Sequence, residues 1–367
     1  MLGLLPAIMI FRVPLTGFGI STMLVAVIAA CCALQITREN DRLRLISPAM
    51  VFVIYIIAQN KGNGAFPVLY LLSLICIFGS MNGAFDFEVA LKTIRVTALL
   101  ATYLLYVQLF AHYLLGINIR TLYDSMVLPD YARSIGYVIK GGLFRPSGFF
   151  LEPSHYAQYT IIALLAVMRE EKLNKWELIM FASGMVASTS GIGILLLAGA
   201  FAYLVFERTR KVPADERAGF IIALVVAIAM ASVVALQIPM VKMSLDRVFA
   251  TDSSGYNAVD GRSVHWDSTV GSLRGSNLIW GVGPKFHRIQ GFITGLNEII
   301  YYYGYLGITL MYLGLLYPAI YNLTGNIVIS VLCVVYGVLI TTSDVVGFIN
   351  ITFWLSLTSH RPPIERE

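Results

Sequence analysis

Long apolar runs recur from one end of this 367-residue chain to the other, and they constrain its fold more than any other feature. Each run holds about 15 to 25 residues, the length that crosses the hydrocarbon core of a bilayer as a helix. Hydrophobic residues make up 57% of the chain and charged residues only 13%, which excludes an ordinary soluble core. Unpaired backbone amides are prohibitive in hydrocarbon, and alternating barrel-like strands are absent from the sequence. We therefore predict an all-α, polytopic integral membrane protein.

We expect about 11 to 12 transmembrane helices, some of them short, in a single membrane domain that covers residues 1–367. Residues 1–11 are interpreted as a short first segment, because they lack the basic start of a cleavable signal. The clearest further segments cover residues 15–36, 45–58, 65–80, 93–115, 149–168, 218–236, 292–317, 327–340 and 345–357.

The apolar run at 176–206 is too long for one ordinary helix, and Ser188-Thr189-Ser190-Gly191 interrupts it. We predict two short helices that meet near Ser190. Lysines and arginines accumulate in short cytoplasmic loops. If the run crosses twice, all the basic clusters of the short loops fall on one side, together with the C-terminal tail. These clusters contain Arg38, Arg42, Arg44, Lys92, Arg95, Arg169, Lys172, Lys175, Arg208, Arg210, Lys211 and Arg217.

Two long loops, residues 116–148 and 237–291, then face the other side, which is the periplasm in a Gram-negative bacterium. The first loop holds four cations and two carboxylates, and the second holds six cations and four carboxylates. Long loops escape the cytoplasmic bias, so the excess of two cations in each has another origin. Surface salt bridges with headgroup contacts are one explanation, and an anionic substrate is the other. The modest net charge of +5 argues against a nucleic-acid partner.

The four cysteines, Cys31, Cys32, Cys76 and Cys333, all fall in apolar runs. A disulfide framework or a zinc site would place them in polar loops at ligand spacing. We therefore interpret them as packing residues and expect no metal site.

The stretch RPSGFFLEPSH, which begins at Arg145, marks the passage from the first outer loop into a membrane helix. It brings Arg145, Glu152 and His155 to the water boundary. Pro153 suits a first helical turn, and Glu152 or Ser154 would cap it, so helix capping is one interpretation. The other is functional, because Glu152 and His155 would share a helix face and act together on one hydroxyl. An ionisable pair beside hydrocarbon is costly, which favours function.

This stretch resembles the Arg-Pro-Ser-x-Phe-Phe-Leu-Glu-Pro-x-His signature of the Wzy-type O-antigen polymerases, within the O-antigen ligase and polymerase superfamily. The break at 188–191, GRSVHW at 261–266 and IWGVG at 279–283 fit the same resemblance. The resemblance implies a GT-C-like glycosyltransferase of the bacterial inner membrane that builds surface polysaccharide at the periplasmic face. Undecaprenyl-diphosphate-linked oligosaccharide would be both donor and acceptor. A polysaccharide chain-length regulator is implied as a partner, with no metal or cofactor required.

That chemistry needs cations to hold the departing diphosphate and a base to deprotonate the attacking hydroxyl. Arginine suits the first task because its planar fork binds phosphate oxygens in pairs. The candidate bases are Glu152 first, His155 second and His265 third. Asn297 is a candidate for lining the cavity. The candidate arginines for diphosphate and sugar binding are Arg145, Arg262, Arg274, Arg247 and Arg288.

Two alternative functions stay open. An O-antigen ligase, which transfers polysaccharide to lipid A core, usually has a His followed by Asn, Ser or Gln, then nine residues and a Gly. Here Leu296 stands in the place of that histidine, before Asn297 and with Gly307 at the expected spacing, which favours the polymerase. A flippase or exporter of lipid-linked sugars would carry charges through the depth of its helices, whereas here they collect at the outer boundary.

Overall fold

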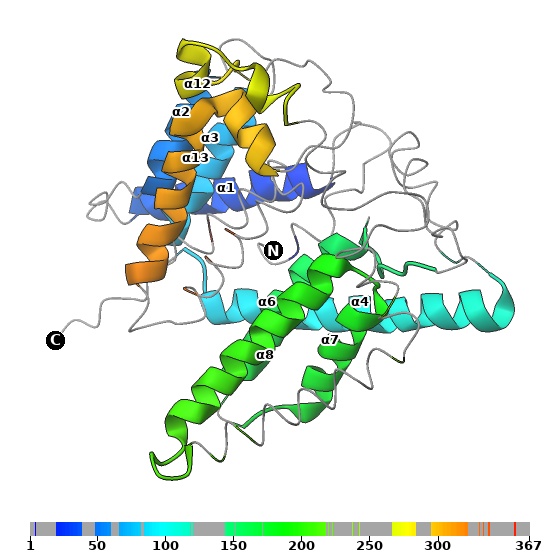
Figure 1. The fold of residues 1–367 in the computed structure, drawn as a ribbon. Helices are drawn as coiled ribbons and strands as arrows, with labels where there is room; N and C mark the ends of the chain where they lie inside the picture. The colour runs from blue at the N-terminus through cyan, green and yellow to red at the C-terminus, as the bar shows by residue number, and fades with distance from the viewer. Residues whose placement is uncertain are drawn as a thin grey trace. The chain divides into compact units, whose positions relative to one another are not determined.

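A computed structural model describes residues 20–38, 48–59, 66–81, 84–117, 144–150, 152–170, 172–217, 266–283 and 295–321, with single positions outside these ranges. Every element of this described part is a helix, as predicted, and it contains no β-strand (Figure 1). The chain divides into two compact units, Met1–Ile94 with Arg262–Glu367, and Arg95–Gly261. The predicted segments at 1–11, 218–236, 327–340 and 345–357 lie almost wholly outside the described residues, so the full number of membrane helices stays a prediction.

The first unit is built on helices α1 (Ile20–Arg38), α2 (Pro48–Gln59), α3 (Phe66–Met81) and α13 (Gly295–Tyr321). Helix α3 packs against α1 and α2, and α2 packs against α13. The 3₁₀ turn η4 (Val270–Ser272) and the short helix α12 (Ser276–Trp280) contact α13. Cys32 and Cys76 are buried in this unit, as packing residues are, and so is Cys333, whereas Cys31 is exposed.

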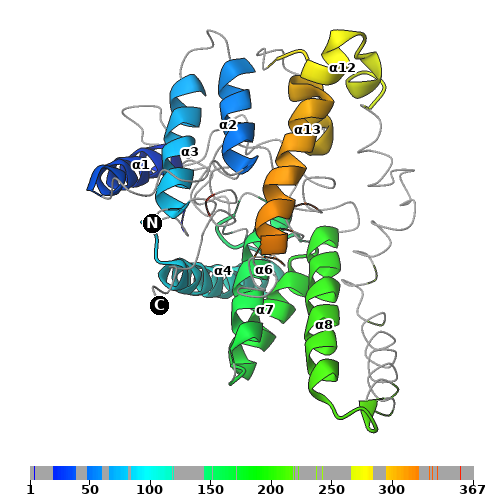
Figure 2. The same cartoon turned by 90° about the vertical axis from the view of Figure 1, so that its left-hand side faces the viewer.

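The second unit contains α6 (Pro153–Arg169), α7 (Lys175–Ala187), α8 (Gly191–Lys211) and most of α4 (Phe87–Leu115). Helix α6 packs against both α7 and α8 (Figure 2). Small residues allow this close approach. A Cβ atom added to Gly184 of α7 would overlap the Tyr156 hydroxyl, and one added to Gly193 of α8 would lie 3.0 Å from the Cβ of Ala157. Helix α6 is therefore the centre of this unit.

The predicted division of the run at 176–206 is confirmed. Helix α7 ends at Ala187 and α8 begins at Gly191. Ser190 caps α8, because its side chain accepts the Gly193 N–H at 3.3 Å. Thr189 adopts a left-handed backbone conformation with φ +55°, which turns the chain sharply. Since only three residues join two helices that are in contact, the chain reverses its direction here.

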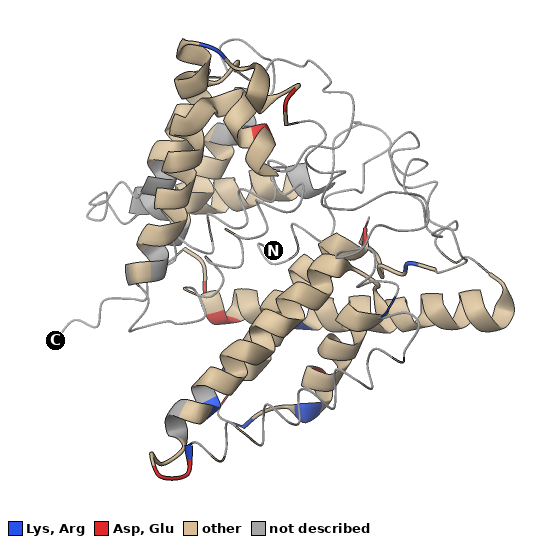
Figure 3. Ribbon diagram, viewed as in Figure 1, with Lys and Arg blue, Asp and Glu red and all other residues tan. Residues whose placement is uncertain are grey.

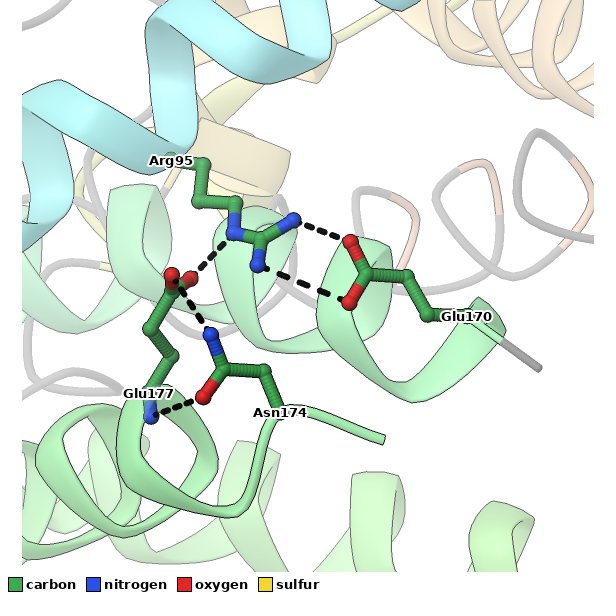
Figure 4. A network of polar contacts seen from close by, with 4 residues as sticks. All are labelled: Arg95, Glu170, Asn174 and Glu177. Atoms are coloured by element: carbon green, nitrogen blue, oxygen red, sulfur yellow. Dashed lines mark hydrogen bonds and ion pairs between the residues drawn. The ribbon is translucent and has the colours of Figure 1, made fainter. Parts of the chain in front are cut away.

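Arg95 of α4 joins the end of α6 to the start of α7. Its guanidinium forms ion pairs with Glu170 and Glu177 (Figure 4). Asn174 completes the network, since its side-chain amide donates to Glu177 at 3.0 Å. The distribution of basic residues in the sequence predicted that Arg95 and the loop at 169–175 lie on the same, cytoplasmic side of the membrane. The ion pairs join Arg95 to the two ends of that loop.

Helix α4 begins at Phe87, six residues before the predicted start at 93. The cause is local, because the Asp86 carboxylate accepts the N–H groups of Glu88 and Val89 at 2.9 and 3.1 Å. Arg95 therefore lies inside the helix rather than at its start.

Two described helices are long and apolar enough to cross a membrane, namely Phe87–Leu115 and Gly295–Tyr317. Met23–Leu34 and Gly191–Phe206 are shorter apolar helices. Figure 3 shows that charged residues are sparse along the described helices and gather mostly near their ends. These features are typical of membrane-embedded helices.

Candidate functional site

The segment that carries Arg145 is held on α4 by the side chain of Gln108. The Gln108 Oε1 accepts the backbone N–H groups of Ser147 and Gly148 at 3.1 and 3.0 Å, and its Nε2 donates to the Gly148 carbonyl at 2.6 Å. Gln108 and Ser147 are 1% and 0% exposed. One buried amide thus satisfies three backbone groups of the turn that follows Arg145.

Glycine is required at the centre of this turn. Gly148 has φ +61°, and an added Cβ would lie 2.6 Å from the Ala101 carbonyl oxygen of α4. Ser147 closes the turn, because its hydroxyl donates to the Phe150 carbonyl at 2.7 Å. The Pro-Ser-Gly-Phe-Phe sequence is therefore a docking element for α4.

Phe144 fixes the other side of Arg145. Its ring stacks on His112 of α4, with centroids 4.3 Å apart and planes 15° apart, and its backbone N–H donates to the Tyr113 hydroxyl at 3.3 Å. Phe144 is 1% exposed, while Arg145 itself is half-buried. The arginine is thus fastened on both sides to the last turns of α4.

Glu152 precedes α6 in an extended conformation, with φ −131° and ψ 153°, and Pro153 opens the helix as predicted. The interpretation of Glu152 as a helix cap is wrong, because its side chain makes no capping hydrogen bond. Instead its carboxylate accepts the Ser154 hydroxyl at 3.0 Å. The carboxylate therefore binds a side chain of the first turn of α6 rather than a backbone N–H group.

His155 lies in the first turn of α6, whereas Glu152 precedes the helix in an extended conformation, so the predicted helix face does not include Glu152. Its Nδ1 atom is buried and makes no hydrogen bond within the part of the chain that the structure describes. Arg145, Glu152 and His155 therefore flank one loop-to-helix junction and supply a cation, a carboxylate and an imidazole. Such a set can bind an anion and accept a proton.

The remaining candidates belong to the first unit or lie outside the described residues. Arg274 is exposed, and its Nη1 atom donates to the Gly271 and Leu273 carbonyls at 2.6 and 2.8 Å. Asn297 is 4% exposed near the start of α13. Both of these residues belong to the first unit, and the Arg145 junction belongs to the second. The candidates outside the described residues are Arg247, Arg262, Arg288 and His265.

The IWGVG segment docks on a break in α13. At Gly304 the backbone leaves the helix, with φ +68° and ψ −175°. Val282 and Gly283 then donate to the carbonyls of Tyr301 and Tyr302 at 2.9 and 3.0 Å. The Tyr55 hydroxyl of α2 donates to the Tyr303 carbonyl at 2.9 Å. The carbonyls released by the break are thus satisfied by the incoming segment and by α2.

Sequence reasoning missed Gln108. The available signal was an amide side chain inside the apolar run at 93–115, since polar groups in such runs have partners or functions. The partner itself was not predictable, because Ser147 and Gly148 lie 39 and 40 residues further along the chain.

Among the described residues, no three or more His, Cys, Asp or Glu side chains are placed to hold a metal ion. Comparisons with protein-family models, with curated proteins and with solved structures find no match for this chain.

Proposed function

We propose that this chain is a multi-pass glycosyltransferase of the bacterial inner membrane that polymerises lipid-linked oligosaccharide repeat units at the periplasmic face. The proposal rests on the resemblance of the RPSGFFLEPSH stretch to the O-antigen polymerases. The observation that carries it furthest is the Arg145 junction, where α4 fastens the arginine on both sides and Glu152 is not engaged in helix capping. Preorganisation of this kind is what catalysis requires of a charged group.

In the proposed reaction, a hydroxyl oxygen of the acceptor sugar attacks the anomeric carbon of the donor chain. The bond between that carbon and the diphosphate oxygen breaks, and undecaprenyl diphosphate leaves with the bonding electrons. Glu152 takes the proton of the attacking hydroxyl, with His155 as the second candidate. Arg145 binds the diphosphate and stabilises its charge as it leaves.

The second outer loop supplies further candidate arginines for binding the diphosphate. Arg274 uses one guanidinium nitrogen to hold its own loop, and the guanidinium carries other donors that suit phosphate oxygens. Arg247, Arg262, Arg288, His265 and Asn297 remain candidates for binding the diphosphate or the sugars. A chain-length regulator remains the proposed protein partner.

The direct test incubates the purified protein, in vesicles, with undecaprenyl-diphosphate-linked repeat units. A ladder of longer lipid-linked chains is the expected product. Transfer to lipid A core in place of a ladder would make the protein a ligase, the alternative that Leu296 disfavours. Movement of the substrate across the bilayer with no new glycosidic bond would make it a flippase.

The site is tested by Glu152→Gln and Arg145→Ala in the same assay. Both variants are expected to lose the ladder while keeping wild-type protein levels, because each removes a group from the reacting region. Glu216→Gln is the matched control for Glu152→Gln, and Lys172→Ala is the control for Arg145→Ala. Both control side chains are exposed, in or next to short loops that are predicted to be cytoplasmic. Normal chain lengths in Glu152→Gln and Arg145→Ala would overturn the assignment of the site.

A further inference from the structure

Helix α12 presents three consecutive large apolar side chains to its surroundings. Leu278, Ile279 and Trp280 are 39%, 54% and 48% exposed. The segment belongs to the predicted outer loop at 237–291, where a polar surface is expected. Contiguous exposed apolar side chains on a short helix indicate a surface that contacts something other than water.

This apolar turn is fixed to the body of the first unit. An added Cβ on Gly281 would overlap the Tyr302 backbone, and one on Gly304 would overlap the Ile279 carbonyl. The Trp280 carbonyl also accepts the Tyr55 hydroxyl at 3.2 Å. These contacts hold the backbone from Ile279 to Gly281, so the C-terminal end of α12 is fixed in an orientation that leaves these side chains exposed.

The apolar turn continues the exposed face of a candidate membrane-spanning helix. Ile279 lies against Gly304, and the next residue along α13, Tyr305, is 47% exposed. Further along the same face Leu313, Leu316 and Ile320 are 49%, 50% and 68% exposed. Thr309 lies on this face too, and its hydroxyl donates back to the Tyr305 carbonyl at 2.7 Å, which hides its polarity from an apolar environment.

Aromatic side chains gather where α12 meets α13. The Trp280 and Tyr303 rings lie 6.3 and 6.4 Å from the Tyr55 ring, measured between centroids. Tryptophan and tyrosine concentrate at the level of lipid headgroups, where an apolar ring and a polar tip are both accommodated. Measured from the break at Gly304 to its end at Tyr321, α13 rises about 26 Å, at 1.5 Å per residue, which is close to the ~30 Å thickness of the hydrocarbon core and agrees with a break near its boundary.

We propose that α12 is an interfacial helix, and that Leu278, Ile279 and Trp280 insert into the outer leaflet of the bilayer beside α13. The partner is membrane lipid, at the boundary of headgroups and acyl chains. This assignment is independent of the glycosyltransferase function, because it depends only on exposed apolar area, a fixed backbone and continuity with the exposed face of α13.

The first test uses Trp280 as the only tryptophan, after Trp176→Phe, Trp266→Phe and Trp354→Phe. The protein is reconstituted in vesicles of phosphatidylcholine and phosphatidylglycerol whose acyl chains carry bromine in their upper or lower part. Bromine in the upper part is expected to quench Trp280 more strongly than bromine in the lower part, since interfacial helices insert about 5–10 Å. Quenching by aqueous iodide with no effect of lipid bromine would overturn the proposal.

The second test compares two positions of α12 without relying on tryptophan. Ile279→Cys and Ser276→Cys are each made in a Cys31→Ala background, because the other three cysteines are buried. Both positions are exposed in the protein. In vesicles, a charged water-soluble maleimide is expected to label Ser276→Cys several-fold faster than Ile279→Cys. Equal labelling rates in vesicles would show that Ile279 faces water and would refute the proposal.

Discussion

Replacement of Gln108 by leucine should release the segment that carries Arg145 while leaving the volume of the side chain nearly unchanged. The amide of Gln108 is the partner of the Ser147 N–H, the Gly148 N–H and the Gly148 carbonyl. Leucine satisfies none of these groups, and all of them are buried. The docked turn therefore loses its hold on α4, and water gains access to it.

The size of the effect follows from the number of groups left without a partner. Each buried backbone group costs about 1–3 kcal/mol when its partner is removed, so the low end for these groups is about 3 kcal/mol. A loss of about 3 kcal/mol corresponds to a roughly 150-fold increase in the opening equilibrium, because about 1.4 kcal/mol is a factor of ten. The low end applies because an opened turn is hydrated.

Hydrogen exchange of a peptide covering residues 144–150 measures this opening directly. In Gln108→Leu the Ser147 and Gly148 amides should exchange roughly 150-fold faster, while amides in the middle of α6 keep their protection. Val107→Leu is the matched control, since Val107 is the neighbouring residue of α4 and is 50% exposed. Unchanged protection of the 144–150 peptide in Gln108→Leu would refute the inference that this amide holds the turn.

Three further changes test the packing of the two units. Gly304→Ala should lower the yield of folded protein more than Gly275→Ala. Both glycines have positive φ, but of the two only Gly304 has backbone atoms in the space that an added Cβ would occupy. Equal yields would contradict the docking of IWGVG on α13. Gly184→Ala should destabilise the protein by about 1–3 kcal/mol through overlap with Tyr156, whereas Gly199→Ala, with open space at its Cβ, should be neutral or mildly stabilising, as measured by thermal melting in detergent. Arg95→Ala should lower the free energy of unfolding by about 1–2 kcal/mol in the same assay, because the side chain is only 23% exposed and its removal leaves Glu170 and Glu177 without their cation. A melting temperature equal to that of Lys172→Ala would exclude a stabilising role for Arg95.

The features predicted well from the sequence depend on local chemistry. Ser190 caps α8 with its own side chain, so a Ser-Thr-Ser-Gly interruption of an apolar run was sufficient to place the break. Pro153 likewise predicted the start of α6 to within a few residues, because proline favours the first turn of a helix. In both cases the residues that determine the structure lie within one helical turn of the feature they produce.

The features that escaped prediction depend on contacts between distant parts of the chain. In the sequence, Gly304 is one of several small residues in an apolar run. The need for glycine at the break in α13 is visible only in the structure, where the Ile279 backbone occupies the space that a Cβ atom of residue 304 would fill. Both capping and chemistry were open for Glu152 from the sequence, and only the structure shows that its side chain makes no capping hydrogen bond. Spacing along the sequence carries no information about such encounters.

The ion pairs of Arg95 also set an order of events during synthesis. Arg95 leaves the ribosome long before Glu170 and Glu177 exist, because the chain is made from its N-terminus. If α4 crosses the bilayer as we propose, the cost of a cation in hydrocarbon holds Arg95 near the water boundary until those carboxylates are made. The arrival of both carboxylates then locks the finished α6 and the emerging α7 to that level. A single arginine thus couples α4 to a helical hairpin that is translated much later.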